Sequence, residues 1–199
     1  MKSPKIFVVF SLILAVSLVY AIDFLVEDNT GNSAGMKSQT NNPSGRKPVT
    51  MIKLLMENGA GVAYNDRDEI HFNAGYLADF RGDVRREFRG VVYHEVVHSL
   101  QWNGMGQAPV WITEGIAEYV RLKAEYAPDH WVGPGGGEKW DKGYDVTARF
   151  FEYCNELMDG FIVELNKKMK DGYSDSFFVE LLGKEVNQLW DEYKVKYGQ

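Results

Sequence analysis

The chain has 199 residues, of which 45% are hydrophobic and 14% aromatic, and this composition excludes a globally disordered protein. The length suits one domain that can bury a core of its own. The formal net charge is −6 at pH 7, which argues against nucleic acid and anionic membranes as partners. Cys154 is the only cysteine, so no intramolecular disulfide can form, and we expect a buried, inert thiol.

Residues 1–21 have the pattern of a signal peptide, with a positively charged start at Lys2 and Lys5. The apolar run over residues 6–19 is too short to favour a membrane-spanning helix, and small residues suitable for cleavage follow it. A membrane anchor is the alternative. We therefore expect a secreted protein with no stable membrane association after signal cleavage.

The segment after the signal peptide, residues 22–48, predicts an extended start followed by a polar linker rich in Asn, Ser, Gly and Thr. Residues 49–199 form the predicted domain. It begins with an apolar run over 49–57, a turn cluster over 65–68 and an alternating segment over 69–73, which together predict a small antiparallel sheet. His71 lies in this sheet, where a histidine on a strand face is more typical than a ligand.

A long helix is predicted next, with Asp83 as its N-cap and Asn103-Gly104 as its stop. It carries H-E-x-x-H as His94, Glu95 and His98. Histidines four residues apart lie on one helix face, and Glu95 is rotated by about 100° from His94. The surrounding residues are apolar nearly all round, so the helix is expected to be buried, and buried polar groups need partners. A metal ion would satisfy them, although ordinary core or surface polar residues are the alternative.

A second helix is predicted over residues 111–126, between Pro109 and Pro128. Glu114 and Glu118 lie one turn apart on one face of it. Either carboxylate could complete a two-histidine, one-glutamate zinc site, with a solvated or supporting role favoured for Glu118. Such a zinc ion (Zn2+) lowers the pKa of a water molecule to about 7.

The glycine-rich segment over 133–137 predicts a loop that forms either a rim or lid of the active site or, equally, a plain connection. A less favoured possibility places His130 and Trp131 in the cleft. Asp145 is predicted to cap the helix that follows. Four short helices are expected over 145–157, 160–170, 174–182 and 185–197, punctuated by glycines.

Two stretches of the sequence resemble the plant basic secretory protein family, namely HEVVHSLQWNGMGQAPVWITEGIAEYVRLKAEYAPDHW and WDKGYDVTARFFEYCNELMDGF. The resemblance extends over about residues 61–198. The family is placed among gluzincin-type metallopeptidases, in which a glutamate of an E-G-x-A-type word is the third zinc ligand. The resemblance therefore implies Glu114 as that ligand and Glu95 as general base. This chain departs from the family in being acidic, and in having a short polar stretch over 28–47 where the family has an extra strand and helix.

Aminopeptidase-type gluzincins place a tyrosine shortly before a Lys-Gly pair to stabilise the oxyanion. Here Trp140 has the corresponding place before Lys142-Gly143, and Tyr144 follows the glycine. Tyr144 is thus a candidate hydrogen-bond donor to the oxyanion, although it follows the Lys-Gly pair where those enzymes have the tyrosine before it. Ordinary packing of Tyr144 is the alternative.

The sequence predicts an α+β, zincin-like fold in which a small antiparallel sheet packs on the H-E-x-x-H helix, followed by a helical C-terminal half. The predicted function is that of a monomeric zinc metallopeptidase, secreted to the apoplast or cell wall, that hydrolyses peptide or protein substrates in plant defence. One alternative is an inactive defence-associated binding protein on the same scaffold. Another is a carbohydrate-interacting protein that uses as stacking surfaces Trp102, Trp111, Trp131 and Trp140.

Overall fold

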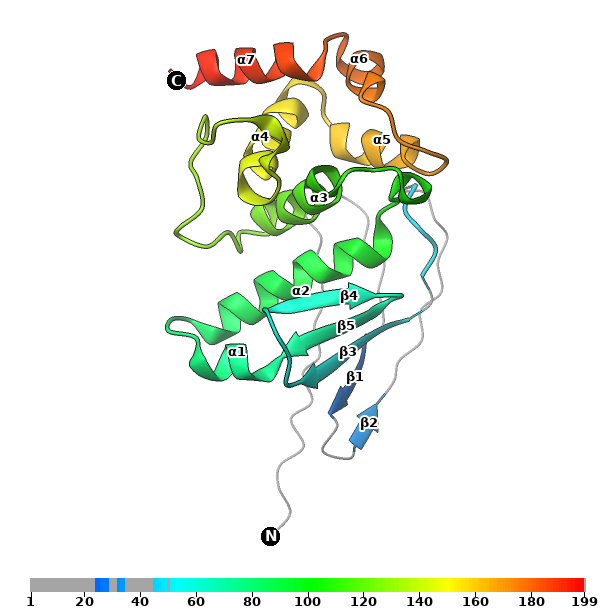
Figure 1. Cartoon of the computed structure of the whole chain (residues 1–199), viewed down its shortest axis with the longest axis vertical. Coiled ribbons are helices and arrows are strands. Elements are labelled where there is room, and N and C mark those ends of the chain that lie inside the picture. Colours follow the sequence, from blue (N-terminus) through cyan, green and yellow to red (C-terminus); the bar gives the residue numbers. More distant parts are fainter. Residues whose placement is uncertain (1–23, 29–31, 35–44, 50, 199) are drawn as a thin grey trace.

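The computed structural model describes the backbone of residues 24–28 and 32–34, and the whole of residues 45–49 and 51–198. The predicted signal peptide lies outside these residues. The described chain is α+β, as the sequence predicts, with a sheet at one end and a helical half at the other (Figure 1). Helix α2, Val84–Leu100, lies between the two and is the element on which the site is built.

The sheet has five strands in the order β2-β1-β3-β5-β4. The prediction of an antiparallel sheet is wrong, because β1 pairs with β3, and β3 with β5, in parallel. The reason is the position of β5, which returns from a hairpin with β4 and inserts next to β3. Strand β2 lies within the segment predicted as a polar linker. The bounds of the strands are β1 Phe24–Asp28, β2 Asn32–Ala34, β3 Ile52–Glu57, β4 Ala63–Asp66 and β5 Glu69–Asn73.

The hairpin of β4 and β5 turns through Arg67 and Asp68, both of which have positive φ. Two residues with positive φ in a two-residue loop are characteristic of a type I′ turn, whose twist matches that of the two strands of a hairpin. The hairpin leaves β4 at the edge of the sheet. Asn65 of β4 fastens this edge to α2, because its Nδ2 donates to Glu95 O and to Ser99 Oγ, each at 2.9 Å.

One face of the sheet is apolar and packs on α2. Ile70 and Phe72 of β5 are fully buried, as alternation along that strand predicts. They form the first core with residues of β3 and of α2, namely Ile52, Leu54, Val91, Val92 and Val96. Val97, on another side of α2, belongs to a separate core in the helical half. Helix α2 is thus buried on two sides, in agreement with its nearly all-round apolar sequence.

Helix α2 begins as predicted, because the side chain of Asp83 accepts from Arg86 N. A short helix before it, α1 (Ala74–Asp79), was not predicted. It is capped by Asn73, whose side chain accepts from Gly75 N. The turn after α2 includes the 3-10 helix η1, Gly104–Gly106.

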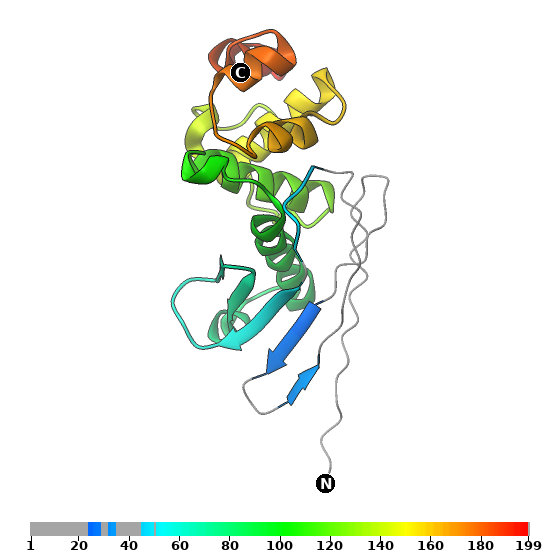
Figure 2. The same ribbon diagram turned by 90° about the vertical axis from the view of Figure 1, so that its right-hand side faces the viewer.

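The helical half begins with α3, Val110–Lys123, and it includes the four predicted C-terminal helices with slightly different ends. Figure 2 shows this half on the opposite side of α2 from the sheet. Its core is rich in aromatic residues, including Phe150, Phe151, Phe161, Phe178 and Tyr193, and Cys154 is buried among them as expected. The remaining elements are η2 Trp140–Lys142, α4 Tyr144–Leu157, α5 Phe161–Lys168, α6 Ser176–Leu182 and α7 Val186–Lys196.

Helix α3 packs closely against α4 at Gly115. A Cβ atom at this position would lie 2.9 Å from Thr147 Cβ and 3.1 Å from Phe151 Cε2, and closer still to the methyl group of Thr147. Glycine is therefore required immediately after Glu114 for the two helices to pack as they do.

The start of α4 differs from the prediction, because Asp145 does not cap the helix. Gly143 is the N-cap residue, and its N–H donates to Thr147 Oγ1 at 2.9 Å. Asp145 instead accepts from Val132 N at 2.8 Å and so fixes the preceding loop.

The glycine-rich loop is also fastened to α7. Gly135 N donates to the hydroxyl of Tyr193 at 2.7 Å, and Lys194 Nζ donates to Gly137 O at 2.9 Å. These hydrogen bonds fix the loop in place. None of residues 133–137 lines the cleft described below, so the loop is a plain connection rather than a rim or lid of that cleft. Across the residues described, no helix combines the length and the apolar character needed to cross a membrane.

Candidate metal centre

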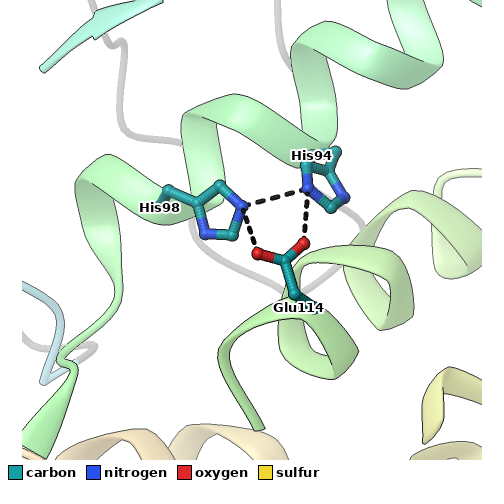
Figure 3. Close-up of side chains that lie close together, drawn as sticks. All are labelled: His94, His98 and Glu114. Atoms are coloured by element: carbon teal, nitrogen blue, oxygen red, sulfur yellow. Dashed lines mark hydrogen bonds and ion pairs between the residues drawn. The ribbon is translucent and has the colours of Figure 1, made fainter. Parts of the chain in front are cut away.

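Two helices bring the predicted metal ligands together (Figure 3). His94 and His98 project from successive turns of α2, and Glu114 projects from the first turns of α3 toward both rings. His94 Nε2 lies 3.0 Å from His98 Nε2 and 3.1 Å from Glu114 Oε2. Glu114 Oε1 lies 3.7 Å from His98 Nε2. Each residue offers one ligand atom to a common point, and the group could hold a metal ion.

The separations between these atoms fit a small tetrahedral ion. Ligands about 2.0–2.1 Å from a tetrahedral zinc ion lie about 3.3–3.4 Å from one another. The two Nε2 atoms lie 3.0 Å apart and His94 Nε2 lies 3.1 Å from Glu114 Oε2, both close to that value, whereas the 3.7 Å contact of His98 Nε2 is with the other carboxylate oxygen, Oε1. The donor set of two imidazoles and one carboxylate is also that of a catalytic site with one open position. The residues therefore fit a zinc ion, while the identity of the metal is a proposal.

Charge is concentrated around His94. Burial by itself lowers the pKa of His94, but the carboxylates of Glu114 and Glu118 outweigh burial and raise it to about 10. Burial, reinforced by the positive charge of His94, lowers the pKa of His98 to about 4. For Glu114, burial raises the pKa, but the contact with His94 prevails and holds it below the usual value. Without metal, the site thus contains a charged His94 and a neutral His98 near neutral pH.

The structure distinguishes the two glutamates that the sequence offers as the third metal ligand. Glu114 faces the Nε2 side of His94, whereas Glu118 Oε1 lies 3.3 Å from its Nδ1. This Nδ1 is buried and has no aligned hydrogen-bond partner among the described residues, and the same holds for Glu118 Oε2. Carboxylates commonly support metal-binding histidines from this second side, where they fix the orientation of the ring.

Glu95 lies beside the histidines and lines the same cleft. Burial raises the pKa of Glu95 to about 7; the charge of His94 opposes this shift, and those of Glu114 and Glu118 add to it. A carboxylate with a pKa near neutrality can both accept and return a proton. This property suits the general base that the sequence predicts at this position.

Gln101 belongs to the site and was not predicted. It ends α2, three residues after His98, and its side-chain nitrogen lies 2.7 Å from His98 Nδ1. The same nitrogen donates to Thr113 O on α3 at 3.2 Å. The i+3 spacing from His98 was the available signal, because residues three apart share a helix face.

A largely buried ion-pair network lines the same cleft beside the metal ligands. Arg121 of α3 pairs with Glu87 of α2 at 3.0 Å and lies 3.8 Å from Glu118 Oε1. The hydroxyl of Tyr76 donates to the other oxygen of Glu87 at 2.9 Å. No sequence pattern identified this network, because its members come from three helices whose packing the sequence does not reveal.

The metal site lies in a cleft of about 1010 Å³ between the edge strand β4 and the start of α4. Tyr64 and Asn65 line it on the strand side, and His130 and Trp131, the less favoured candidates, line it as well. Tyr144 lines the cleft opposite the strand and is 53% exposed. The negative charge of Glu114 raises the pKa of Tyr144, so its hydroxyl keeps its proton.

The tryptophans proposed as carbohydrate-stacking surfaces have other roles. Trp140 is buried in the helical core, and Trp102 and Trp111 pack against that core. Trp131 lies near the guanidinium of Arg121, which is 5.5 Å from its ring. His71, the remaining histidine considered above, stacks on Tyr64 and pairs with Glu57 at 2.9 Å.

Comparison with known proteins identifies the family of the chain. A family model described as a peptidase of plants and bacteria matches residues 23–193. A relative named basic secretory protease, from Boswellia serrata, is 45% identical over 60 residues, which make up 30% of this chain and 69% of the relative. No solved structure matches the chain. Because the family model spans most of the chain, the protein belongs to the basic secretory protease family, the peptidases of plants and bacteria.

Proposed function

We propose that the protein is a secreted, zinc-dependent peptidase on a zincin-like scaffold. The observation that carries this proposal is the convergence of His94, His98 and Glu114 on one point inside an open cleft. Donors at these separations suit zinc, and the family supplies the peptidase activity at a general level.

A zinc ion in a three-ligand site supplies Lewis acidity and makes a water molecule nucleophilic near neutral pH. The chain's own residues provide the proton transfers. Glu95, with a pKa near 7 caused by burial, takes a proton from the attacking water and delivers it to the leaving amine. Glu118 holds the ring of His94 from its Nδ1 side.

Tyr144 is the candidate for stabilising the oxyanion of the tetrahedral intermediate. It stands on the opposite side of the cleft from β4, and its backbone has a positive φ of 48° directly after Gly143. A residue other than glycine in this conformation is unusual and is often found at functional sites. No hydrogen bond engages its hydroxyl among the described residues, so the group is free to donate to a substrate.

We propose an extended peptide as substrate. Strand β4 is an edge strand and borders the cleft through Ala63, Tyr64 and Asn65. Its outer backbone groups can pair with a peptide by strand addition. A cleft of about 1010 Å³ lies at the upper end of the range for small-molecule pockets, as expected for a site that takes several residues. Secretion to the plant apoplast and a role in defence complete the proposal.

Metal analysis and hydrolysis assays test the proposal together. We expect about one zinc ion per chain in the purified protein, loss of the ion in His98→Ala, and cleavage of a peptide library that stops when a chelator is added. Absence of metal from the folded wild-type protein would refute the zinc site. Metal without cleavage of any peptide would instead support an inactive binding protein on this scaffold.

A further inference from the structure

The face of the sheet that is turned away from α2 carries a stacked aromatic pair at its edge. Along β4, Ala63 and Asn65 face α2, whereas Tyr64 points to the opposite face and is 52% exposed. Tyr64 lies opposite His71 of β5, and the two rings stack with centroids 4.5 Å apart and planes 3° apart. His71 is held in turn by Glu57, whose Oε1 lies 2.9 Å from its Nδ1. The ring of Tyr64 is therefore supported from one side.

The other side of the Tyr64 ring faces the position of a further strand. Neighbouring strands lie about 4.7–4.9 Å apart, and the 4.5 Å between the ring centroids is close to that spacing. Two nearly parallel rings at this distance stand side by side across the strands, so the uncovered face of Tyr64 is turned away from β5 and beyond the edge of the sheet. Among the described residues, no second ring packs on Tyr64. Because Tyr64 also lines the cleft, this face borders the place of a peptide added to β4.

The hydrogen bonds of the hairpin determine which backbone groups of β4 remain free. Asn73 N donates to Val62 O at 2.9 Å. Hydrogen-bonded pairs alternate along an antiparallel ladder, so Tyr64, two residues further on, also directs its backbone groups toward β5. The N–H and C=O groups of Ala63 and Asn65 consequently point outward from the edge. A peptide that pairs with them in the antiparallel direction places one residue directly opposite Tyr64, at a position without hydrogen bonds, where facing side chains approach most closely.

Charged side chains next to the stack are paired with one another. Lys53 pairs with Glu69 at 3.0 Å, and Arg67 pairs with Asp66 at 2.9 Å. The residue opposite Tyr64 therefore meets an exposed aromatic ring flanked by compensated charges. This surface suits a neutral aromatic side chain better than a charged one.

We propose that Tyr64, with His71 as its positioning residue, forms a subsite for an aromatic side chain of the peptide substrate. This inference rests on the proposed function and deepens it by naming one substrate residue. A ring opposite Tyr64 extends the stacked row by a third member, on the face of the sheet away from the metal ligands. From the usual strength of aromatic pairs, we expect a ring at this position to increase affinity about 2–10-fold over alanine.

Peptide hydroxamates test the proposal, because the hydroxamate binds the zinc ion and so fixes the register of the peptide without requiring hydrolysis. One alanine series extends from each side of the hydroxamate, and phenylalanine is moved through each series one position at a time. Dissociation constants are measured by calorimetry with the zinc-loaded wild-type chain. We expect phenylalanine to increase affinity at one position that depends on Tyr64.

The variants separate the ring from its support. Tyr64→Ala should abolish the gain at that position and leave the other positions unchanged, whereas Tyr64→Phe, which keeps the ring, should retain it. His71→Ala should reduce the gain, and His71→Phe, which restores a stacked ring, should recover it. Met51→Ala is the matched control, because it removes an apolar side chain of similar exposure, 46%, next to β3 and outside the lining of the cleft. All its affinities should equal those of the wild type.

The outcomes distinguish this inference from the proposed function. If the phenylalanine gain is absent in the wild type, or survives in Tyr64→Ala, the subsite is refuted and the zinc site remains. An equal loss of affinity for every peptide in Tyr64→Ala also refutes it, because that result indicates a structural effect on the strand. If the zinc-loaded protein binds the hydroxamates but cleaves no peptide, the peptidase function is wrong, and the same affinities still decide the role of Tyr64. If the wild type binds no zinc and no hydroxamate, both proposals are wrong.

Discussion

Replacing Gly115 with alanine should disturb the metal site through the packing of α3 against α4. The new Cβ would lie 2.9 Å from Thr147 Cβ and 3.1 Å from Phe151 Cε2, and it would overlap the Thr147 methyl group. Thr147 cannot rotate away, because its Oγ1 accepts from Gly143 N and donates to Trp140 O. Helix α3 must therefore move away from α4, and Glu114 moves with it.

The magnitude follows from two opposing effects. Overpacking of a close contact costs about 1–3 kcal/mol, and the severity of this overlap places it in the upper half of that range. Alanine is better than glycine in a helix by about 1 kcal/mol, which leaves a net destabilisation of about 1–2 kcal/mol. For a chain of this length, each kcal/mol lowers Tm by about 2–4 °C, so we expect a decrease of about 2–8 °C.

Thermal unfolding of the metal-free protein and zinc affinity of the folded protein are the two measurements. Gly133→Ala is the matched control, because nothing lies within 4 Å of the added Cβ, and its effect should be within about 0.5 kcal/mol. The double variant with Thr147→Ser removes the overlapping methyl group but keeps the hydroxyl, and it should recover part of both losses. Unchanged Tm and unchanged zinc affinity in Gly115→Ala would refute the reasoning.

Four further predictions concern the chemistry of the site. Glu95→Gln should keep the metal but lower the rate of peptide hydrolysis by about 10²–10⁴-fold; full turnover with normal zinc content would exclude Glu95 as general base. Tyr144→Phe should also keep the metal and lower kcat by about 10²–10³-fold if the hydroxyl stabilises the oxyanion, and an effect on KM alone would contradict this role. Glu118→Gln should weaken zinc binding by about 10–100-fold and should also lower metal-free stability near neutral pH, because the carboxylate of Glu118 stabilises protonated His94; equal affinity in a chelator competition would argue against support of His94 by Glu118. Finally, the pKa of His94 is about 10 without metal, so at pH 8 the ring is still protonated, and zinc binding should release about one proton. Calorimetry in buffers of different ionisation enthalpy measures this number, and a binding enthalpy that is independent of buffer would contradict it.

The elements that could be predicted from the sequence are those in which hydrophobic residues repeat with the period of a helix or a strand. Helix α2 and strand β5 appear where their 3.6-residue and two-residue patterns place them. The relative position of His94 and His98 was also predictable, because the geometry of a single helix determines it. Cys154 is buried as its helix-like, aromatic surroundings indicated.

The parts that were not predicted depend on how separate elements pack. Residues 49–73 were expected to form an antiparallel sheet, and the hairpin of β4 and β5 is antiparallel. The parallel pairing of β5 with β3 was missed because it joins segments that are not adjacent in the sequence. The choice between Glu114 and Glu118 depends on the crossing of α2 and α3, so only the resemblance to a known family could select between them. Gln101 was missed because its importance depends on the carbonyl of Thr113, which belongs to the next helix.

The two separate hydrophobic cores have a consequence for folding. His94 and His98 are on α2, which shares the core of the sheet, whereas Glu114 is on α3, which contributes Ile112, Ile116 and Ala117 to the aromatic core of the helical half. An ion bound by all three residues joins these two cores directly. Its binding free energy then adds to the cooperativity between two folding units as well as to overall stability. Hydrogen exchange should therefore show the sheet and the helical half opening together when zinc is bound, and opening with different free energies after the ion has been removed.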